Sequence, residues 1–323
     1  MVYSTHAQGF VLRPSRFPTP DSRPPTPDSR PPIPVPLRYV QRVSPRTLAL
    51  VALTLVAFAS NSLLCRLALR DGAIDWASFT SIRLASGAVA LWILVAVPRR
   101  RSPLAEGSAR MAGALVLYAV AFSFAYLELN AGTGALVLFG AVQATMIAAG
   151  IVGGERPTAW EWLGLAGAVG GLVYLVSPGL EAPDPLGAAS MAMAGVAWGF
   201  YSLWGRGVPQ PGAATAGNFV RAAPFGLIPL ALLARQLHVT SEGVLLAAVS
   251  GAFTSGVGYV IWYQALRGLT ATRAAVVQLA VPIVAAFGGV LLLGESLTWR
   301  LGLASVVTLG GVGIAVFGRS RRR

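Results

Sequence analysis

The apolar residues of this chain gather in long runs that are separated by short polar connections. Ten of these runs approach or exceed the length of about 17–25 residues that an apolar helix needs to cross a bilayer. They cover residues 48–69, 76–98, 110–129, 133–153, 159–177, 186–205, 216–234, 243–266, 271–293 and 299–318. The pattern predicts an all-α polytopic membrane protein with ten transmembrane helices. The connections are too short to hold a soluble catalytic domain.

The sequence of the first half returns in the second half. Residues 153–171 read GGERPTAWEWLGLAGAVGG, and residues 293–311 read LGESLTWRLGLASVVTLGG. The two segments align without a gap, which places Glu155 on Glu295 and the Gly-Gly pair at the end of one segment on that of the other. An internal repeat in a hydrophobic chain is typical of transporters.

Each copy of the repeat holds five predicted spans, and five is an odd number. The second copy must therefore enter the membrane from the face opposite to the first. We expect two inverted five-helix repeats, at residues 46–178 and 184–318, related by a pseudo-two-fold axis in the membrane plane. In such an arrangement the two bundles can rock about a site near the bilayer midplane, which is the basis of alternating access.

The charged residues support a membrane location and an orientation. They make up 11% of the chain, against about 25% in soluble domains. All 25 basic residues are arginines, and in the ten-span arrangement nineteen lie on the side of the termini and four on the other. The positive-inside rule then predicts a multi-pass protein of the plasma or inner membrane with both termini in the cytoplasm. This explains the basic charge without a nucleic-acid partner.

The ends of the chain are polar. Residues 1–45 are rich in Pro and Arg, and the heptapeptide TPDSRPP occurs at 19–25 and again at 26–32. Such a segment buries too little apolar surface to fold, so we expect a disordered cytoplasmic tail, with a proline-rich ligand for a partner protein as the alternative. Residues 319–323 are expected to form a basic cytoplasmic C-terminus.

The sequence motifs of common hydrolytic and phosphoryl-transfer enzymes do not occur in this chain. There is one cysteine, Cys65, and the two histidines, His6 and His238, lie in the tail and in a connection. HExxH, GxSxG and phosphate-binding glycine loops do not occur. We therefore predict no enzymatic activity, no cofactor and no metal site.

Together these features resemble the EamA domain of the drug/metabolite transporter superfamily. The resemblance covers about residues 48–318 and rests on the duplicated Gly-Glu, the glycine-rich fifth and tenth spans, Arg83 in the second span and Val281-Pro282 in the ninth. One departure is Val142-Gln143, where the second half has proline. The resemblance implies a secondary transporter, most often an exporter, of small polar or amphiphilic metabolites such as amino acids.

Other functions stay open beside this one. A nucleotide-sugar or phosphorylated-metabolite exchanger would want cationic residues beyond Arg83 and Arg221, and a non-transporting sensor or lipid-acting protein would tolerate changes to the polar residues of the spans. The expected partners are a small-molecule substrate and the lipid bilayer, without nucleic acid. The glycine-rich fifth and tenth spans also suit a homodimer contact.

Buried charges are few in the predicted spans. Arg83 and Arg221 lie mid-span at matching positions of the repeat, where a charge costs about 2.5–3.5 kcal/mol. Either they bind an anionic group of the substrate, or they tie their helices to backbone carbonyls. Glu155 and Glu295 are expected at helix ends, where they cap helices and pair with arginines.

Polar and aromatic side chains within the spans are the expected lining of a transport pathway, because unpaired polar groups are costly in lipid. The predicted lining residues are Asn61, Ser62, Arg83, Ser123, Tyr126, Gln143, Trp198, Tyr201, Ser202, Arg221, Tyr259, Tyr263 and Gln278. Pro282 is expected to bend the ninth span, either as a gating element or as a static kink.

Overall fold

A computed structural model describes residues 44–100, 102–154, 158–179, 182–205, 208–267, 269 and 277–320. All of them belong to one compact unit, Val43–Arg323. The regular structure of these residues is helical, with one isolated β-bridge between Ile74 and Val239. The tail predicted at residues 1–45 lies outside the described residues, apart from its last two positions, which already belong to the first helix and its cap.

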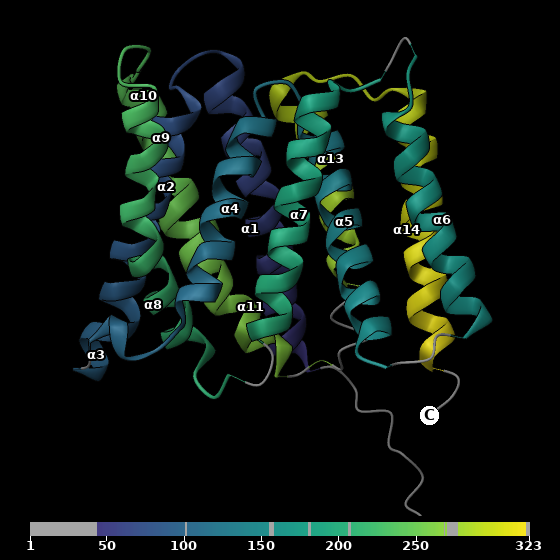
Figure 1. The fold of residues 1–323 in the computed structure, drawn as a ribbon, viewed down its shortest axis with the longest axis horizontal. Coiled ribbons are helices and arrows are strands. Elements are labelled where there is room, and N and C mark those ends of the chain that lie inside the picture. The colour runs from purple at the N-terminus through teal and green to yellow at the C-terminus, as the bar shows by residue number, and fades with distance from the viewer. Residues whose placement is uncertain are drawn as a thin grey trace, which may run out of the picture. The chain divides into compact units, whose positions relative to one another are not determined.

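The first half of the chain forms five helical stretches (Figure 1). They are α1 (Pro45–Arg70); α2 (Trp76–Leu91), which continues as the π-helical η1 (Trp92–Ala96) and α3 (Val97–Arg99); α4 (Ala109–Ala125), which follows the short η2 (Pro103–Ala105); α5 (Ala131–Val152); and α6 (Ala159–Val176).

The second half repeats this order. Its stretches are α7 (Pro185–Gly205); α8 (Pro211–Ala222), which continues as η3 (Ala223–Gly226) and α9 (Leu227–Leu232); α10 (Ser241–Val249), which continues as the π-helical η4 (Ser250–Val257) and α11 (Gly258–Leu266); α13 (Ala280–Leu293); and α14 (Trp299–Ser320).

The ten predicted runs thus correspond to ten helical stretches of the described residues. Five of these are long and apolar enough to cross a membrane by length and composition, namely Pro45–Arg70, Trp76–Ala96, Ala131–Val152, Pro185–Gly205 and Ser241–Leu266. Shorter apolar helices are Ala109–Ala125, Trp162–Val176, Ala280–Leu293 and Trp299–Ile314.

Polar residues directly before the apolar runs decide where several helices begin. The side chains of Ser44, Asp75, Ser108 and Thr240 each accept a hydrogen bond from a backbone N–H in the first turn of the helix that follows. Such caps satisfy donors that would otherwise be left without a partner at a helix start. The capping residues explain why the helices start within a few residues of the predicted runs.

The two halves of the chain are interleaved. Each of the extensive helix contacts joins one helix of the first half to one of the second. α1 packs on α13 and α11, just as its counterpart α7 packs on α5 and α4, and the pair α6–α14 maps onto itself when the halves are exchanged. This contact pattern is that of two inverted repeats. The repeats are therefore units of sequence and not separate compact bodies.

The pair α6–α14 lies at one side of the helical bundle (Figure 1). Its helices approach closely because glycines face each other. A Cβ atom at Gly167 would lie 3.3 Å from the Cα of Gly311, and one at Gly171 would overlap Thr308. The glycine stripe that suited a dimer contact in the sequence is thus occupied by a contact within the chain.

The ninth span is interrupted near its proline. Residues 277–278 are helical, Leu279 forms a turn, and α13 starts at Ala280 with the buried Pro282 in its first turn. Proline lacks the N–H that would continue the helical hydrogen bonds to the preceding turn. The break therefore lies where the sequence places the bend.

Candidate functional site

A small cavity lies inside the bundle between helices of both halves. Its walls come from α1, α4 and α5 of the first half and from α7, η4 and α11 of the second. The residues that line it are Phe58, Asn61, Ser62, Tyr118, Phe122, Leu138, Phe139, Trp198, Thr254 and Tyr259. The cavity volume is about 20 Å³, which is room for about one water molecule. In the described conformation the cavity therefore has no room for a metabolite.

Asn61 is the centre of the polar wall. Its Nδ2 donates to the Tyr118 hydroxyl over 3.2 Å, and its Oδ1 accepts hydrogen bonds from Ser250 Oγ (2.8 Å) and Thr254 Oγ1 (3.1 Å). The asparagine is buried, so these bonds compensate the loss of water. They tie α1 to α4 and to η4.

The π-helical turn η4 arranges the hydroxyls of the eighth span. In a π-helix the backbone hydrogen bonds run over five residues rather than four. Residues four and five apart then both lie near the same face, so that Ser250 and Thr254 reach Asn61 while Ser255 reaches Arg83. π-Helical turns are frequent at functional sites.

Arg83 lies directly behind the cavity wall and is almost completely buried, with 2% of its surface exposed. Its Nε donates to Ser255 Oγ over 3.3 Å and its Nη2 to the Tyr118 hydroxyl over 3.1 Å. The guanidinium carbon lies 5.1 Å and 4.7 Å from the ring centroids of Tyr118 and Phe122. Its Nη1 has no hydrogen-bond partner among the described residues, and none of their carboxylates forms an ion pair with it.

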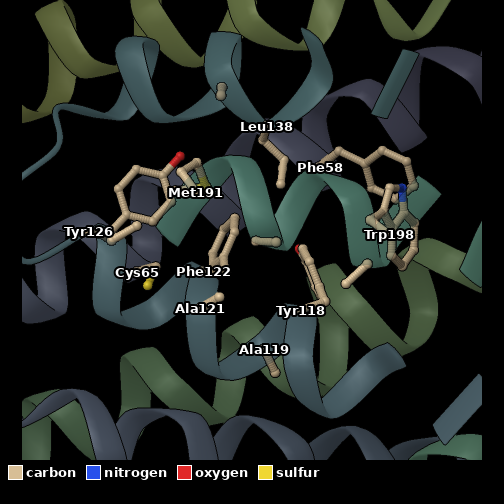
Figure 2. Packing of buried hydrophobic residues seen from close by; sticks show 14 of the residues in the cluster. Phe58, Cys65, Tyr118, Ala119, Ala121, Phe122, Tyr126, Leu138, Met191 and Trp198 are labelled. Atoms are coloured by element: carbon tan, nitrogen blue, oxygen red, sulfur yellow. The ribbon is translucent and has the colours of Figure 1, made fainter. Parts of the chain in front are cut away.

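Aromatic rings form the rest of the wall. Phe58, Trp198 and Tyr259 pack mutually, with centroids 4.7–6.4 Å apart. Figure 2 shows Tyr118 and Phe122 on α4 and Tyr126 at its C-terminal cap, with Phe58, Leu138 and Trp198 nearby. Rings with a polar tip suit a small amphiphilic ligand.

The predicted lining residues separate into three groups. Asn61, Ser62, Trp198 and Tyr259 line the cavity, and Arg83 contacts its wall from behind. Tyr201 forms the next layer, because its ring stacks on Trp198 at 5.3 Å and its hydroxyl accepts a hydrogen bond from Asn218. The others are outside the wall of this conformation: Ser123, Tyr126, Gln143, Ser202, Arg221, Tyr263 and Gln278.

Arg221 differs from its repeat partner Arg83. Its Nη1 donates to the backbone oxygens of Glu106 (2.6 Å) and Gly217 (3.1 Å), and its Nη2 donates to that of Leu104 (2.7 Å). It fastens α8 to the connection between the second and third spans. Of the two roles weighed for these arginines, the tie to backbone carbonyls describes Arg221.

Several wall residues were missing from the sequence-based set. They are Phe58, Tyr118, Phe122, Leu138, Phe139 and Thr254. Tyr118 and Phe122 could have been found from their spacing. They lie four residues apart from each other and in line with Tyr126, which places all three on one face of a helix. The spacing of Ser250 and Thr254 is the same kind of signal.

A buried ion pair joins five helices at one face of the bundle. Glu295 accepts a hydrogen bond from Arg66 Nε at Oε1 (3.3 Å) and one from the backbone N–H of Ala131, the first residue of α5, at Oε2 (2.9 Å). Arg66 Nη1 also donates to the backbone oxygens of Tyr126 and Leu127. Side-chain exposure is 11% for the arginine and 7% for the glutamate. Glu155, the repeat partner of Glu295, lies outside the described residues.

Two connections are paired at the same face (Figure 1). Ala73 and Asp75, between α1 and α2, exchange backbone hydrogen bonds of 2.8–3.0 Å with Thr240 and His238, which lie between α9 and α10. The Asp75 carboxylate accepts a further hydrogen bond from the His238 N–H. These bonds and the Arg66–Glu295 pair hold this face together.

Helices from two inverted repeats that surround a small internal cavity form the architecture of a polytopic membrane protein of the transporter type. The EamA-like transporter family model matches residues 185–317. A Pseudomonas aeruginosa protein described as uncharacterised is 50% identical over 277 residues, which cover 86% of this chain and 96% of that protein. The chain belongs to the EamA-like transporter family and is a multi-pass membrane protein.

More distant relatives agree with this assignment. An uncharacterised transporter of Archaeoglobus fulgidus is 26% identical over 287 residues, which cover 84% of this chain and 97% of the relative. A solved crystal structure of a protein superposes with a TM-score of 0.62 at 18% identity and covers 87% of this chain and 98% of that one. The second likeness concerns the fold alone.

Proposed function

We propose that the protein is a secondary transporter that exports small polar or amphiphilic metabolites, such as amino acids, by alternating access. The observation that carries the proposal is the small internal cavity whose walls come from both repeats. When helices of two inverted repeats rearrange between two arrangements related by the pseudo-two-fold axis, the site among them opens first to one side of the membrane and then to the other.

The lining supports a ligand with both a polar and an apolar part. Asn61, Thr254 and the Tyr118 hydroxyl lie on one wall, and Phe58 and Trp198 contribute rings. Pockets of this kind fix orientation with a few polar groups and gain affinity from apolar ones. The volume of about 20 Å³ is too small for a metabolite, so uptake of a ligand requires the helices to separate.

The orientation of the chain in the plasma or inner membrane is part of the proposal. With both termini in the cytoplasm, as the arginine distribution suggests, the Arg66–Glu295 pair lies at the outer face. Release of an exported substrate then requires this pair to separate. In this proposal the Arg66–Glu295 pair keeps the outer face closed until the substrate is released.

The alternative of a nucleotide-sugar or phosphorylated-metabolite exchanger receives less support. Phosphate groups are commonly held by several Arg or Lys side chains. Among the described residues the cavity wall contains no Arg or Lys, and Arg83 stands alone behind it. A membrane-embedded enzyme would need a general base beside its nucleophile, and among the described residues the wall offers hydroxyls and one amide but no carboxylate or imidazole.

Flux from proteoliposomes tests the proposal. Vesicles with the purified chain are loaded with a broad metabolite extract, and the compounds that leave are identified by mass spectrometry, with and without a proton gradient. We expect a few compounds to leave faster than from protein-free vesicles. Asn61→Ala should slow them by about tenfold, because it removes the donor to Tyr118 and the acceptor for Ser250 and Thr254.

Ser202→Ala is the control variant, because Ser202 is a polar residue of the sixth span that does not line the cavity. It should leave flux unchanged. If no compound leaves faster than from protein-free vesicles under either condition, the transport function is wrong. If Ser202→Ala slows flux as much as Asn61→Ala, the cavity is not the transport site.

A further inference from the structure

We propose that the ligand of the cavity carries a carboxylate and that Arg83 and Tyr118 recognise it. This inference rests on the transport function proposed above and names the class of substrate. Three observations support it: an unpaired buried charge, the direction of the hydrogen bonds in the polar wall, and the place of the arginine relative to the aromatic rings.

The first observation is the charge of Arg83. The guanidinium is buried inside a membrane bundle, and the described residues supply two hydroxyls and two aromatic faces as its partners but no carboxylate. Buried charges are costly unless an opposite charge or a full set of hydrogen bonds compensates them. An anionic ligand in the adjacent cavity would supply the missing negative charge.

The second observation is the direction of the hydrogen bonds at Tyr118. A hydroxyl has one proton to donate and two lone pairs that accept. The Tyr118 oxygen already accepts from Asn61 Nδ2 and from Arg83 Nη2, since neither nitrogen can accept. To any further partner the hydroxyl therefore offers its proton.

The Asn61 carbonyl oxygen also accepts from the bundle. It accepts from Ser250 Oγ over 2.8 Å, and it shares the single proton of Thr254 Oγ1 (3.1 Å) with the Ser250 backbone oxygen (2.6 Å). At the centre of the polar wall the Tyr118 and Asn61 oxygens thus already accept from donors of the bundle. Such a wall favours a ligand group that accepts hydrogen bonds, as a carboxylate does with both oxygens.

The third observation, the position of Arg83 beside the aromatic rings, favours an anionic over a cationic ligand. Aromatic rings such as Phe58, Trp198 and Tyr259 also form sites for organic cations. Here, however, the Arg83 guanidinium lies 5.1 and 4.7 Å from the ring centroids of Tyr118 and Phe122, which both line the cavity, and covers one face of each ring. A second cation next to them would be repelled at short range in a medium of low dielectric constant.

The free Nη1 of Arg83 completes the geometry. Nη1 and Nη2 form the end of one planar fork, and Tyr118 occupies only Nη2. A carboxylate that displaces the tyrosine hydroxyl as the helices separate can therefore bind the fork with both oxygens. Lysine offers no such fork, so Arg83→Lys should keep the positive charge but lose the paired hydrogen bonds to the carboxylate.

Ligand binding to the full chain in detergent tests this inference. The probes are small amino acids and aliphatic or aromatic monocarboxylates, each paired with its primary amide and with the amine of the same carbon skeleton. Binding is measured by the shift in melting temperature over a concentration series. We expect at least one acid to bind tenfold or more tightly than its amide, and the amines to bind least.

Three variants assign the preference to residues. Arg83→Gln and Tyr118→Phe should each reduce the ratio of acid to amide affinity, to near one for the first and by about threefold to tenfold for the second. Tyr118→Phe keeps the ring and tests the proposal even if Arg83→Gln does not fold. The control is Arg221→Gln, the repeat partner whose bonds go to backbone oxygens, which should keep the ratio of the unchanged chain.

The outcomes separate this inference from the function on which it rests. Carboxylate recognition is overturned if amides or amines bind as tightly as the acids, or if no acid binds. In either case the flux experiment still reports whether other compounds are transported. An acid preference that survives both Arg83→Gln and Tyr118→Phe would overturn the assigned residues. A lack of flux for every compound concerns the transport function itself.

Discussion

Replacing Glu295 with alanine is expected to destabilise the closed bundle by about 3–5 kcal/mol, the cost of removing one partner of a buried ion pair. The change leaves Arg66, whose side chain is 11% exposed, without its countercharge and the Ala131 N–H without its acceptor. The melting temperature in detergent should fall accordingly. In addition, the face that the pair closes should open more often.

Cys65 provides a built-in reporter of that opening. It is the only cysteine of the chain, it is buried, and it precedes Arg66 in α1. In the Glu295→Ala variant its labelling by a maleimide should accelerate by at least about tenfold, because each 1.4 kcal/mol changes the open fraction by a factor of ten. An unchanged labelling rate together with an unchanged melting temperature would show that the pair does not close this face.

The matched control is the exposed ion pair next to it. Asp71 pairs with Arg70 over 2.8 Å, with side chains that are 55% and 33% exposed. Exposed pairs contribute about 0–1 kcal/mol, so Asp71→Ala should change neither the melting temperature nor the labelling of Cys65 appreciably. Equal effects of Asp71→Ala and Glu295→Ala would contradict the role assigned to burial.

The second large effect is expected at the contact between α6 and α14. A Cβ atom at Gly311 would lie 2.5 Å from the backbone nitrogen of Ala168 and 2.6 Å from the backbone oxygen of Gly164. Backbone atoms cannot turn aside as a side chain can, so Gly311→Ala must push the helices apart. We expect a loss of about 1–3 kcal/mol, measured as a lower melting temperature.

Gly310 is the control, one residue earlier in the same helix. A Cβ atom there meets nothing within 4 Å. Gly310→Ala should therefore be neutral or slightly stabilising, because alanine is the better helix former by about 1 kcal/mol. If both variants lower the melting temperature equally, close backbone approach is not what Gly311 provides.

Most of the fold could be predicted from the sequence, because the length of an apolar run and the parity of the repeat leave few alternatives. Ten runs gave ten helical stretches, and five spans per copy required the copies to be inverted. The interleaving of the halves is harder to read, since a hydrophobic residue looks alike whether it packs on a helix of its own half or on one of the other.

The candidate site could be predicted only in part. Asn61, Trp198 and Tyr259 stand out as polar or amphipathic residues in apolar spans, and they line the cavity. Arg83 and Arg221 align in the repeat, yet one lies behind the cavity and the other binds a connection, because what surrounds a side chain depends on helices distant in sequence.

The π-helical turn η4 could not be predicted from the sequence, for a different reason. The residues from Ser250 to Val257 read as an ordinary stretch of a membrane helix, and nothing in their composition indicates a π-helix. α2 packs closely against the wider turn, and Gly251 lies against the backbone of Arg83. The hydroxyls that complete the polar wall could therefore be listed from the sequence but not placed.

The π-helical turn η4 lies in the middle of the eighth span and sets the rotation of α11 relative to α10. A π-turn holds one residue more than an α-turn, so returning η4 to α-helical bonding would rotate α11 against α10 by about 100°, the step of one residue in an α-helix. That rotation would carry Tyr259 and Trp262, whose rings now pack 5.9 and 6.0 Å from that of Phe58, around the helix axis. The π-helical turn therefore determines which face of α11 meets Phe58.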